Sequence, residues 1–470
     1  MISMHSLEKR FLSIAFVFGL LIIILTPPFQ MADEDSHFKK TYLVSNFDLL
    51  PKTVDQVKGN YFPPAVLEFE NKHRNQIGNT EVKYTFTQLQ SLNFPVDMKG
   101  EKVFTPYSTA TVHPLLYIPQ VTMILLVKPI VWLCSPDLIN PAFYLYTGRL
   151  GNLLFFLACM FYAIKLMPFY KHVMFMLGMM PMTLSLASSL NYDSMVIGVS
   201  LLVVSYILRL SYDSSQTQIT RKSIIFLCIA AVLLIELKLI YYPLLLLVLL
   251  IPVSKFRNTK ERWKSIGIIW GTGAVTHLAW MLLTQIALAS PGGTSNGTEQ
   301  VKFILYHPVE YIKVLARTFM ELRFYYINSF VGNLGWLDTN LPMLFIIAYL
   351  IGLLVLAIFD TNKGIQLQWK DKIITVGIFL FILLLVETSL YIIWTSIPEI
   401  GGVGYRIVSG VQGRYFIPCV ILGLTLLYPT TGLFRQWREK AMGLISGSIP
   451  TLGICSGLVT IAMLLLRYWI

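Results

Sequence analysis

Long apolar runs recur along the whole chain, and this pattern constrains the fold more than any motif does. Three of the clearest are residues 266–288, 341–359 and 373–394. Each is long enough for a helix that crosses the hydrocarbon core of a bilayer, which takes about 20 residues. The 470 residues are 55% hydrophobic and only 13% charged, against roughly 25% charged in soluble domains. The sequence therefore predicts an all-α integral membrane protein, a single polytopic helical bundle over residues 1–470.

The formal net charge of +12 comes from Lys and Arg residues in short connectors between the apolar runs. Such connectors are signals of membrane topology, and they do not form the aromatic-interleaved basic face that favours nucleic-acid binding. The five Cys residues lie within or beside apolar segments and show no CxxC spacing. We therefore expect no nucleic-acid partner, no disulfide framework and no zinc site.

Short connectors rich in Lys and Arg are retained on the cytoplasmic side of a membrane. The basic connectors are residues 165–172, 209–222, 255–264, 363–372 and 435–440. All of them face the cytoplasm if the amino terminus is inside and the chain crosses the membrane about 11 times. The predicted spans lie near residues 11–28, 146–166, 173–190, 194–211, 223–236, 240–253, 266–289, 341–359, 373–394, 414–430 and 445–467.

Two segments then lie on the extracytoplasmic side, residues 29–145 and residues 290–340. The first is too long for a simple connector, and it contains an apolar piece at residues 115–134. A span there would place the later basic connectors outside, so we expect this piece to be a helix lying along the membrane surface. The charged segment 301–330 is expected to lie on the membrane in the same way.

An acidic cluster follows directly after the first apolar run. It consists of Asp33, Glu34 and Asp35, with His37 two residues further on. A solvated helix end is the simple interpretation of such a cluster. Carboxylates packed beside one another and beside an imidazole also raise one another's proton affinity, which suits a general base or a cation ligand.

Further polar residues are predicted to fall near the same face of the membrane. Each one alone is typical of a helix cap or an ion pair. Together they predict an outer cavity with carboxylates and cationic groups, and its Arg and Lys side chains would suit the phosphate of an anionic lipid. These residues are Arg149, Asn152, Asn191, Asp193, Glu236, Lys238, Arg406 and Arg414.

Six motifs follow one another along residues 21–422. They are PPFQMADEDSHF at 27–38, HPLLYIPQ at 113–120, GRL at 148–150, SLNYD at 189–193, GWLDT at 335–339 and GVQGRYF at 410–416. In this order they resemble a bacterial membrane family catalogued only as domain of unknown function 2142. That family is similar to the C-type glycosyltransferases, multispan enzymes that use polyprenyl-phosphate sugars and carry an Asp-Glu pair in the first outer loop.

The resemblance implies roles for individual residues. Asp33 would be the catalytic base that deprotonates the acceptor hydroxyl, beside Glu34 as a second catalytic carboxylate. Asp35, His37, Asn191 and Asp193 would be supporting polar groups. Asp33, Glu34 and Asp193 would also suit a divalent cation, Mg²⁺ or Mn²⁺. The donor phosphate would be held by Arg414, Arg149, Tyr415 and Lys238.

The sequence departs from the family pattern at two places. Ala32 stands where the family usually has Pro, and Asn191-Tyr192 replaces the commoner Ser-Pro before Asp193. Neither change removes a reactive group, but both affect the backbone that places one.

The function expected from the sequence is transfer of a sugar from a polyprenyl-phosphate carrier to a cell-envelope glycan. The expected location is a bacterial cell membrane, with the active face extracytoplasmic. One alternative is a flippase or other transporter of lipid-linked oligosaccharides, which usually shows paired halves and polar residues at mid-bilayer. A ligase or polymerase of preformed lipid-linked glycans is the other. The sugar and the acceptor are not specified by the sequence.

Overall fold

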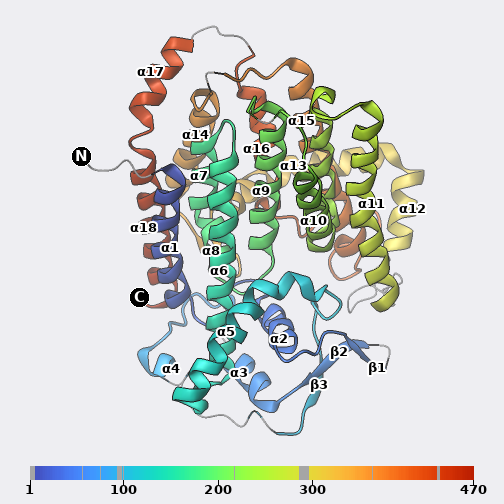
Figure 1. Cartoon of the computed structure of the whole chain (residues 1–470). Helices are drawn as coiled ribbons and strands as arrows, with labels where there is room; N and C mark the ends of the chain where they lie inside the picture. Colours follow the sequence, from blue (N-terminus) through green and yellow to red (C-terminus); the bar gives the residue numbers. More distant parts are fainter. Residues whose placement is uncertain are drawn as a thin grey trace.

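The computed structural model describes residues 6–55, 57–74, 76–90, 92, 98, 100–215, 217–284, 296–362, 364–430 and 435–470. It is 71% helix and 4% strand, which confirms the predicted class of a helical membrane protein. Long helices run side by side through most of the molecule, and shorter helices and strands form a separate layer at one end (Figure 1). We call this layer, residues 29–140, the cap layer.

Most helices of the bundle contain apolar runs that were recognisable in the sequence, whereas the helix that begins at Arg435 starts in the predicted basic connector 435–440. Their bounds are α1 (Leu7–Leu25), α6 (Pro141–Leu166), α7 (Lys171–Met179), α8 (Pro181–Ala187), α9 (Asp193–Tyr212), α10 (Arg221–Leu237), α11 (Thr259–Thr284), α14 (Met343–Phe359), α15 (Trp369–Leu390), α16 (Val420–Leu424), α17 (Arg435–Ile445) and α18 (Ile449–Tyr468). Helix α9 is the most deeply buried of the long apolar helices, with 83% of its apolar window inside the protein against 17% for α11. The bundle is therefore organised around α9, with α11 at its edge.

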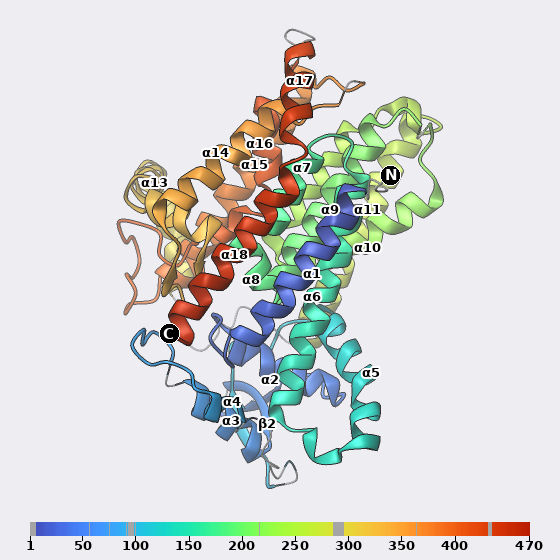
Figure 2. The same ribbon diagram turned by 90° about the vertical axis from the view of Figure 1, so that its left-hand side faces the viewer.

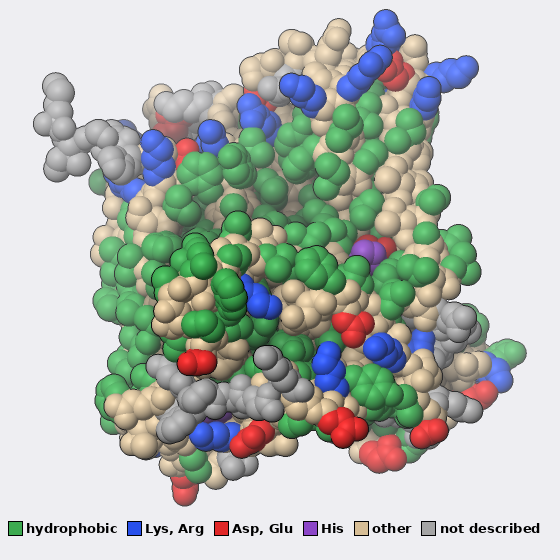
Figure 3. Space-filling view, turned by 60° about the horizontal axis from the view of Figure 1, so that its bottom comes forward, with side chains coloured by type: hydrophobic (Ala, Val, Ile, Leu, Met, Phe, Trp, Pro, Cys, Tyr) green, Lys and Arg blue, Asp and Glu red, His purple; other side chains and the backbone are tan. Residues whose placement is uncertain are grey.

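Among the described residues, six helices are long and apolar enough to cross a membrane. They are Pro114–Cys134, Pro141–Leu166, Asp193–Tyr212, Thr259–Thr284, Trp369–Thr395 and Ile449–Tyr468. Shorter apolar helices, Leu239–Leu250 and Met343–Phe359, lie among them. Figure 3 shows a broad hydrophobic surface between charged side chains at the two ends of the molecule, as expected for a protein surrounded by lipid.

The cap layer contains a small antiparallel sheet of order β1-β2-β3, in which Gly59 of the central strand faces both Lys52 and Pro106. Helix α5 lies beside the lower part of α6, level with the rest of this layer and beyond the end of α1 (Figures 1 and 2). The elements of the layer are α2 (Glu34–Ser45), β1 (Lys52–Val54), β2 (Val57–Phe62), α3 (Pro64–Arg74), α4 (Phe86–Gln90), β3 (Val103–Pro106), η2 (Pro114–Tyr117), α5 (Ile118–Cys134) and η3 (Pro136–Leu138).

The later polar segment folds as α12 (Gly297–Tyr306) and α13 (Pro308–Val331), followed by the short strands β4 (Asn333–Leu334) and β5 (Thr339–Asn340). Both helices pack against the end of α15 and the loop after it. The Tyr326 hydroxyl donates to the buried Glu387 carboxylate at 2.9 Å, and Gln300 accepts from the backbone N–H of Gly404 at 3.1 Å.

Several predicted spans are interrupted where the sequence contains Pro or Gly. Pro181 separates α7 from α8, because proline lacks the N–H that a continuous helix needs. Residues 239–250 form a 3₁₀ helix, η4, that contains Pro243. Its 12 residues cover about 24 Å at 2.0 Å per residue, against about 18 Å in an α-helix. The geometry lets this segment reach further than its short sequence suggests.

The segment predicted as a span at 414–430 begins with a 3₁₀ turn, η7 (Gly413–Phe416), and continues as α16. Gly413 lies directly against the backbone of α13, where an added Cβ atom would collide with the Tyr326 carbonyl and the Phe330 N–H. The close approach of η7 to α13 therefore requires glycine at this position.

Replacing this glycine should disturb the protein more than replacing one in open space. We expect Gly413→Ala to lower the free energy of unfolding by about 1–3 kcal/mol, the usual cost of overpacking. Gly352→Ala in α14 is the control, because a Cβ there meets no atom within 4 Å, and alanine favours helix by up to about 1 kcal/mol. Thermal unfolding in detergent checks both variants, and equal stability of the two would contradict the packing argument.

Candidate functional site

A fully buried ion pair between Glu34 and Arg149 joins the cap layer to the bundle. Arg149 Nε donates to Glu34 Oε1 at 2.8 Å and Nη2 donates to Oε2 at 2.6 Å, and both side chains are 0% exposed. The Glu34 carboxylate also accepts the backbone N–H groups of Phe29 and Leu190 at 3.0 and 2.8 Å. One carboxylate thus connects α2, α6 and the loop before α9.

The remaining N–H groups of Arg149 bind carbonyl oxygens at the end of α1. Nη1 donates to Ile23 and Thr26 at 3.2 and 2.6 Å, and Nη2 donates to Pro27 at 3.0 Å. All five guanidinium N–H groups are therefore used within the protein. The prediction that Arg149 binds the donor phosphate is therefore wrong. Each carboxylate oxygen of Glu34 already accepts two hydrogen bonds, so Glu34 cannot act on a substrate in this geometry. Both residues are structural.

The neighbouring residue, Asp33, has the opposite character. Its side chain is exposed, and among the residues that the structure describes nothing donates a hydrogen bond to its carboxylate. Its backbone adopts the left-handed conformation, with φ of 62°, at the start of α2. Asp and Asn enter this region more readily than other side chains. The turn therefore directs Asp33 away from the pair that fixes Glu34.

Although Asp33 reaches solvent, the pKa of its carboxyl is raised above its ordinary value, chiefly because the protein around it displaces part of the surrounding water. Arg414 opposes this shift, and the negative charges of Asp193 and Asp35 add to it. A raised pKa makes the carboxylate a stronger base than a free aspartate.

Two cations converge on Asp193 at the first turn of α9. Lys238 Nζ lies 2.6 Å from Asp193 Oδ1, and Arg414 Nε lies 3.7 Å from Oδ2. The Arg414 Nε–H group is buried and has no hydrogen-bond partner among the described residues. Lys238 follows α10 and Arg414 lies on η7, so both cations come from places where α-helical backbone is interrupted. We call Asp33, Asp193, Lys238 and Arg414 the charged cluster.

Aromatic rings surround the charged cluster. Lys238 Nζ lies 4.6 Å from the Tyr415 ring centroid and 5.4 Å from that of Tyr192, and the Arg414 guanidinium lies 5.5 Å from Tyr415. These contacts stabilise the cations through the negative faces of the rings. Tyr192 was not predicted as a site residue, although its position directly before Asp193 was a usable signal.

His37 lies beside the cluster but is neutral. Its Nδ1 is 2.8 Å from the Tyr117 hydroxyl, and its ring packs edge-on against Tyr192. Burial lowers the pKa of His37 to about 4, and this outweighs the opposite effects of Asp193 and Asp35. The expectation that the acidic neighbours raise its proton affinity overall is therefore wrong. Tyr117, 80 residues further along the chain, was not predicted as a site residue, although it lies within the HPLLYIPQ motif at 113–120.

Other predicted site residues have separate roles. Asp35 faces α3, where its carboxylate pairs with Arg74 at 3.1 Å. The Asn191 side chain accepts the Ser194 backbone N–H at 3.1 Å at the start of α9, so it acts as a helix cap. Two further polar residues of the predicted cavity pair elsewhere: Arg406 with Glu321 at 2.8 Å, and Glu236 with His277 at 3.4 Å.

Among the described residues, no three His, Cys, Asp or Glu side chains are grouped to hold a metal ion. Glu34 is bound to Arg149, so the expected set of Asp33, Glu34 and Asp193 does not come together as ligands. Asp193 already faces two cations. The charged cluster instead offers an exposed base and two positive groups, an arrangement that can accept a proton and stabilise an anionic oxygen.

The molecule is thus a polytopic helical membrane protein with a charged cluster where its bundle meets a cap layer. The chain belongs to a family described as predicted membrane protein (DUF2142), whose model matches residues 16–422. The comparisons find no matching curated protein and no matching solved structure. Every member of the charged cluster lies within the matched region.

Removing one partner of the buried pair should be costly, because it leaves an uncompensated charge inside the protein. We expect Arg149→Met to lower the free energy of unfolding by about 3–5 kcal/mol. Arg406→Met is the matched control, since Arg406 pairs with Glu321 while its side chain is 59% exposed, and exposed pairs contribute about 0–1 kcal/mol. Unfolding in detergent, followed by circular dichroism, compares them. Similar losses in both variants would contradict a structural role for the pair.

Proposed function

We propose that this protein is a glycosyltransferase that moves a sugar from a polyprenyl-phosphate carrier to a glycan acceptor. The observation that supports this best is the charged cluster, in which an exposed carboxylate with a raised pKa lies near two cations. Such a transfer needs a base for the acceptor hydroxyl and positive charge for the departing phosphate. In the charged cluster, Asp33 would supply the base, and Lys238 and Arg414 would supply the positive charge.

In the proposed reaction, Asp33 removes the proton from the acceptor hydroxyl as its oxygen attacks the anomeric carbon. The bond from that carbon to the lipid phosphate oxygen breaks, and the phosphate leaves with the electron pair. Direct displacement of this kind inverts the anomeric centre.

The positive groups of the cluster stabilise the leaving phosphate. Arg414 has an unpartnered Nε–H among the described residues and is held beside Tyr415. Lys238 faces Asp193, which balances its charge until an anionic donor arrives. Phosphate binding by Arg and Lys is favoured because each supplies a positive charge with several N–H donors.

We further propose that the cap layer and the charged cluster face the extracytoplasmic side of a bacterial cell membrane. In this arrangement the amino terminus is cytoplasmic, the chain makes about 11 crossings, and α5 lies at the membrane surface. The basic connectors, such as residues 255–264, then face the cytoplasm. The acceptor is a cell-envelope glycan, because that is the glycan that the outer leaflet meets.

Replacing the base is the direct test of the reaction. We expect Asp33→Asn to lower the transfer rate by about 10²–10⁴-fold, because the amide cannot accept the proton. Asparagine also tolerates the left-handed backbone at this position, so the fold should be retained. The measurement is transfer of labelled sugar from a panel of polyprenyl-phosphate sugars to isolated cell-envelope glycan, with the purified protein in proteoliposomes.

Asp35→Asn is the matched control, because its carboxylate lies two residues away and pairs with the half-exposed Arg74. That variant should transfer within about tenfold of the parent, because the Asp35 carboxylate faces Arg74 on α3 and does not contact the reacting groups. Full activity of Asp33→Asn, or equal loss in both variants, would remove Asp33 from the mechanism. Movement of intact lipid-linked glycan across the bilayer without sugar transfer would favour a flippase.

The orientation has its own test with single cysteines. Arg257→Cys lies in a basic connector and Thr298→Cys lies at the start of α12, and both positions are exposed. In intact cells, an impermeant thiol reagent should label Thr298→Cys and leave Arg257→Cys unlabelled until the cells are opened. The native Cys residues are first replaced by Ser or Ala. The reverse pattern of labelling would invert the proposed topology.

A further inference from the structure

We propose that an apolar groove between α5, α6, α9 and α10 holds the hydrocarbon chain of the lipid substrate, while the charged cluster at the start of α9 takes its phosphate. The binding of the lipid phosphate by the charged cluster rests on the proposed function. The groove itself is a cavity of about 480 Å³, within the 300–1,000 Å³ that ligand pockets usually have.

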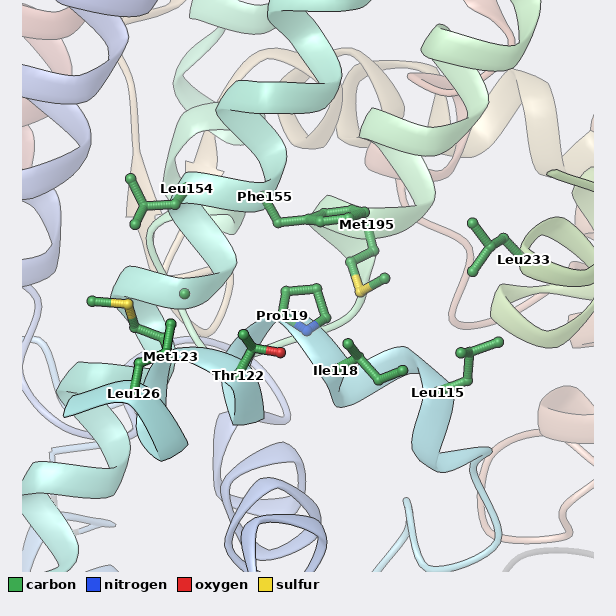
Figure 4. Close-up of a pocket in the computed structure, with 11 residues that line it drawn as sticks. Leu115, Ile118, Pro119, Thr122, Met123, Leu126, Leu154, Phe155, Met195 and Leu233 are labelled. Atoms are coloured by element: carbon green, nitrogen blue, oxygen red, sulfur yellow. The ribbon is translucent and has the colours of Figure 1, made fainter. Parts of the chain in front are cut away.

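The lining of the groove fits a hydrocarbon chain. Phe155, Met195 and Leu233 approach it from the bundle, and Leu115 of η2 and Ile118 at the start of α5 approach it from the cap layer (Figure 4). Of the lining side chains that the structure describes, Thr122 alone carries an oxygen or nitrogen atom. A polar headgroup or sugar would lose its hydrogen bonds to water in such a groove, whereas an apolar chain loses none.

The groove opens at the side of the bundle. Ile118, Leu126 and Leu154 line it, and their side chains remain 50%, 63% and 39% exposed. In a helical membrane protein this open side faces lipid, so a chain can enter without leaving an apolar environment. A protein helix is a poor occupant, because a helix 10–12 Å across fills about 480 Å³ with little more than one turn.

Two of the helices that line the groove, α9 and α10, also lead to residues of the charged cluster. Met195 lies two residues after Asp193 on the opposite face of α9. Leu233 lies about 7 Å along α10 from Lys238 at 1.5 Å per residue. Ile118 follows Tyr117, whose hydroxyl contacts His37. The groove and the charged cluster therefore lie on opposite faces of the start of α9, and a headgroup attached to a chain in the groove reaches the cations around that end of the helix.

The groove should orient the chain and add little affinity, since lipid tails are as apolar as the groove lining. The positive charge of Lys238 and Arg414 then favours a lipid with an anionic headgroup over one with a neutral headgroup. The proposed function identifies this lipid as a single-chain polyprenyl phosphate.

Photo-crosslinking tests the inference without requiring sugar transfer. The probe is a polyprenyl phosphate that carries a diazirine on an isoprene unit near the phosphate, in phosphatidylcholine proteoliposomes with the full chain. We expect crosslinked peptides to map to residues 115–126 and 151–155. Thr122→Trp fills the groove and should lower the yield of these crosslinks at least about tenfold, equivalent to 1.4 kcal/mol. Leu125→Trp is the control on the same helix, 38% exposed and outside the groove.

Two competitors distinguish the sources of the signal. Unlabelled undecaprenyl phosphate should suppress the crosslinks at concentrations where phosphatidylglycerol and inorganic phosphate do not. Crosslinks spread evenly over the lipid-facing helices, equal competition by phosphatidylglycerol, or unchanged yield in a folded Thr122→Trp variant would overturn the inference.

The outcome for the groove is separable from the outcome for the enzyme. Asp33→Asn should crosslink like the parent, because the base takes no part in holding the chain. If crosslinks map to the groove and no donor is processed, the chain site stands and the proposed transfer fails. If transfer proceeds and Thr122→Trp transfers from long-chain donors like the parent, the groove inference fails and the transfer stands.

Discussion

The buried pair of Glu34 and Arg149 is the contact on which the geometry of the site depends. Two charges removed from water are tolerated only with complete pairing, and here every guanidinium N–H has an acceptor. The pair fixes the end of α1, the start of α2 and the loop before α9 to α6. Asp33 directly precedes Glu34, and Asp193 directly follows the loop before α9. The Glu34–Arg149 pair therefore helps to set the positions of both Asp33 and Asp193.

The two cations of the charged cluster lie where helices are interrupted. Lys238 lies between the end of α10 and the 3₁₀ helix η4, and Arg414 lies within the 3₁₀ turn η7. Backbone that leaves the α-helical pattern inside a membrane protein must be buried in protein or line a cavity. Gly413 allows η7 to press against α13, and Tyr241 donates a hydrogen bond to the Tyr415 carbonyl at 2.7 Å. The backbone irregularity is thereby satisfied while the two cations point toward Asp193.

The sequence was sufficient for the class of fold and for much of the charged cluster, because apolar length and charged residues beside helix ends are local signals. Pairing and burial are not local. Nothing near Arg149 in the sequence shows that Glu34, 115 residues away, occupies its guanidinium, so Arg149 was assigned to a phosphate. His37 was misjudged because burial outweighs its acidic neighbours. The breaks at Pro181 and within η7 were hidden inside runs whose composition alone indicates continuous spans.

Glu34 and Asp33 are adjacent carboxylates with different environments, so one short motif can serve the structure and the proposed chemistry together. Glu34 is buried and fully bonded, whereas Asp33 is exposed and unbonded among the described residues. A base must reach solvent or substrate, but it must also be held in place. The left-handed backbone of Asp33 turns its side chain outward, while Glu34 next to it anchors the chain. The apolar groove opens toward lipid on the far side of α9 from Asp193. In the proposed reaction, the lipid-linked donor and the water-borne acceptor therefore reach the charged cluster from different sides, so neither has to cross the path of the other.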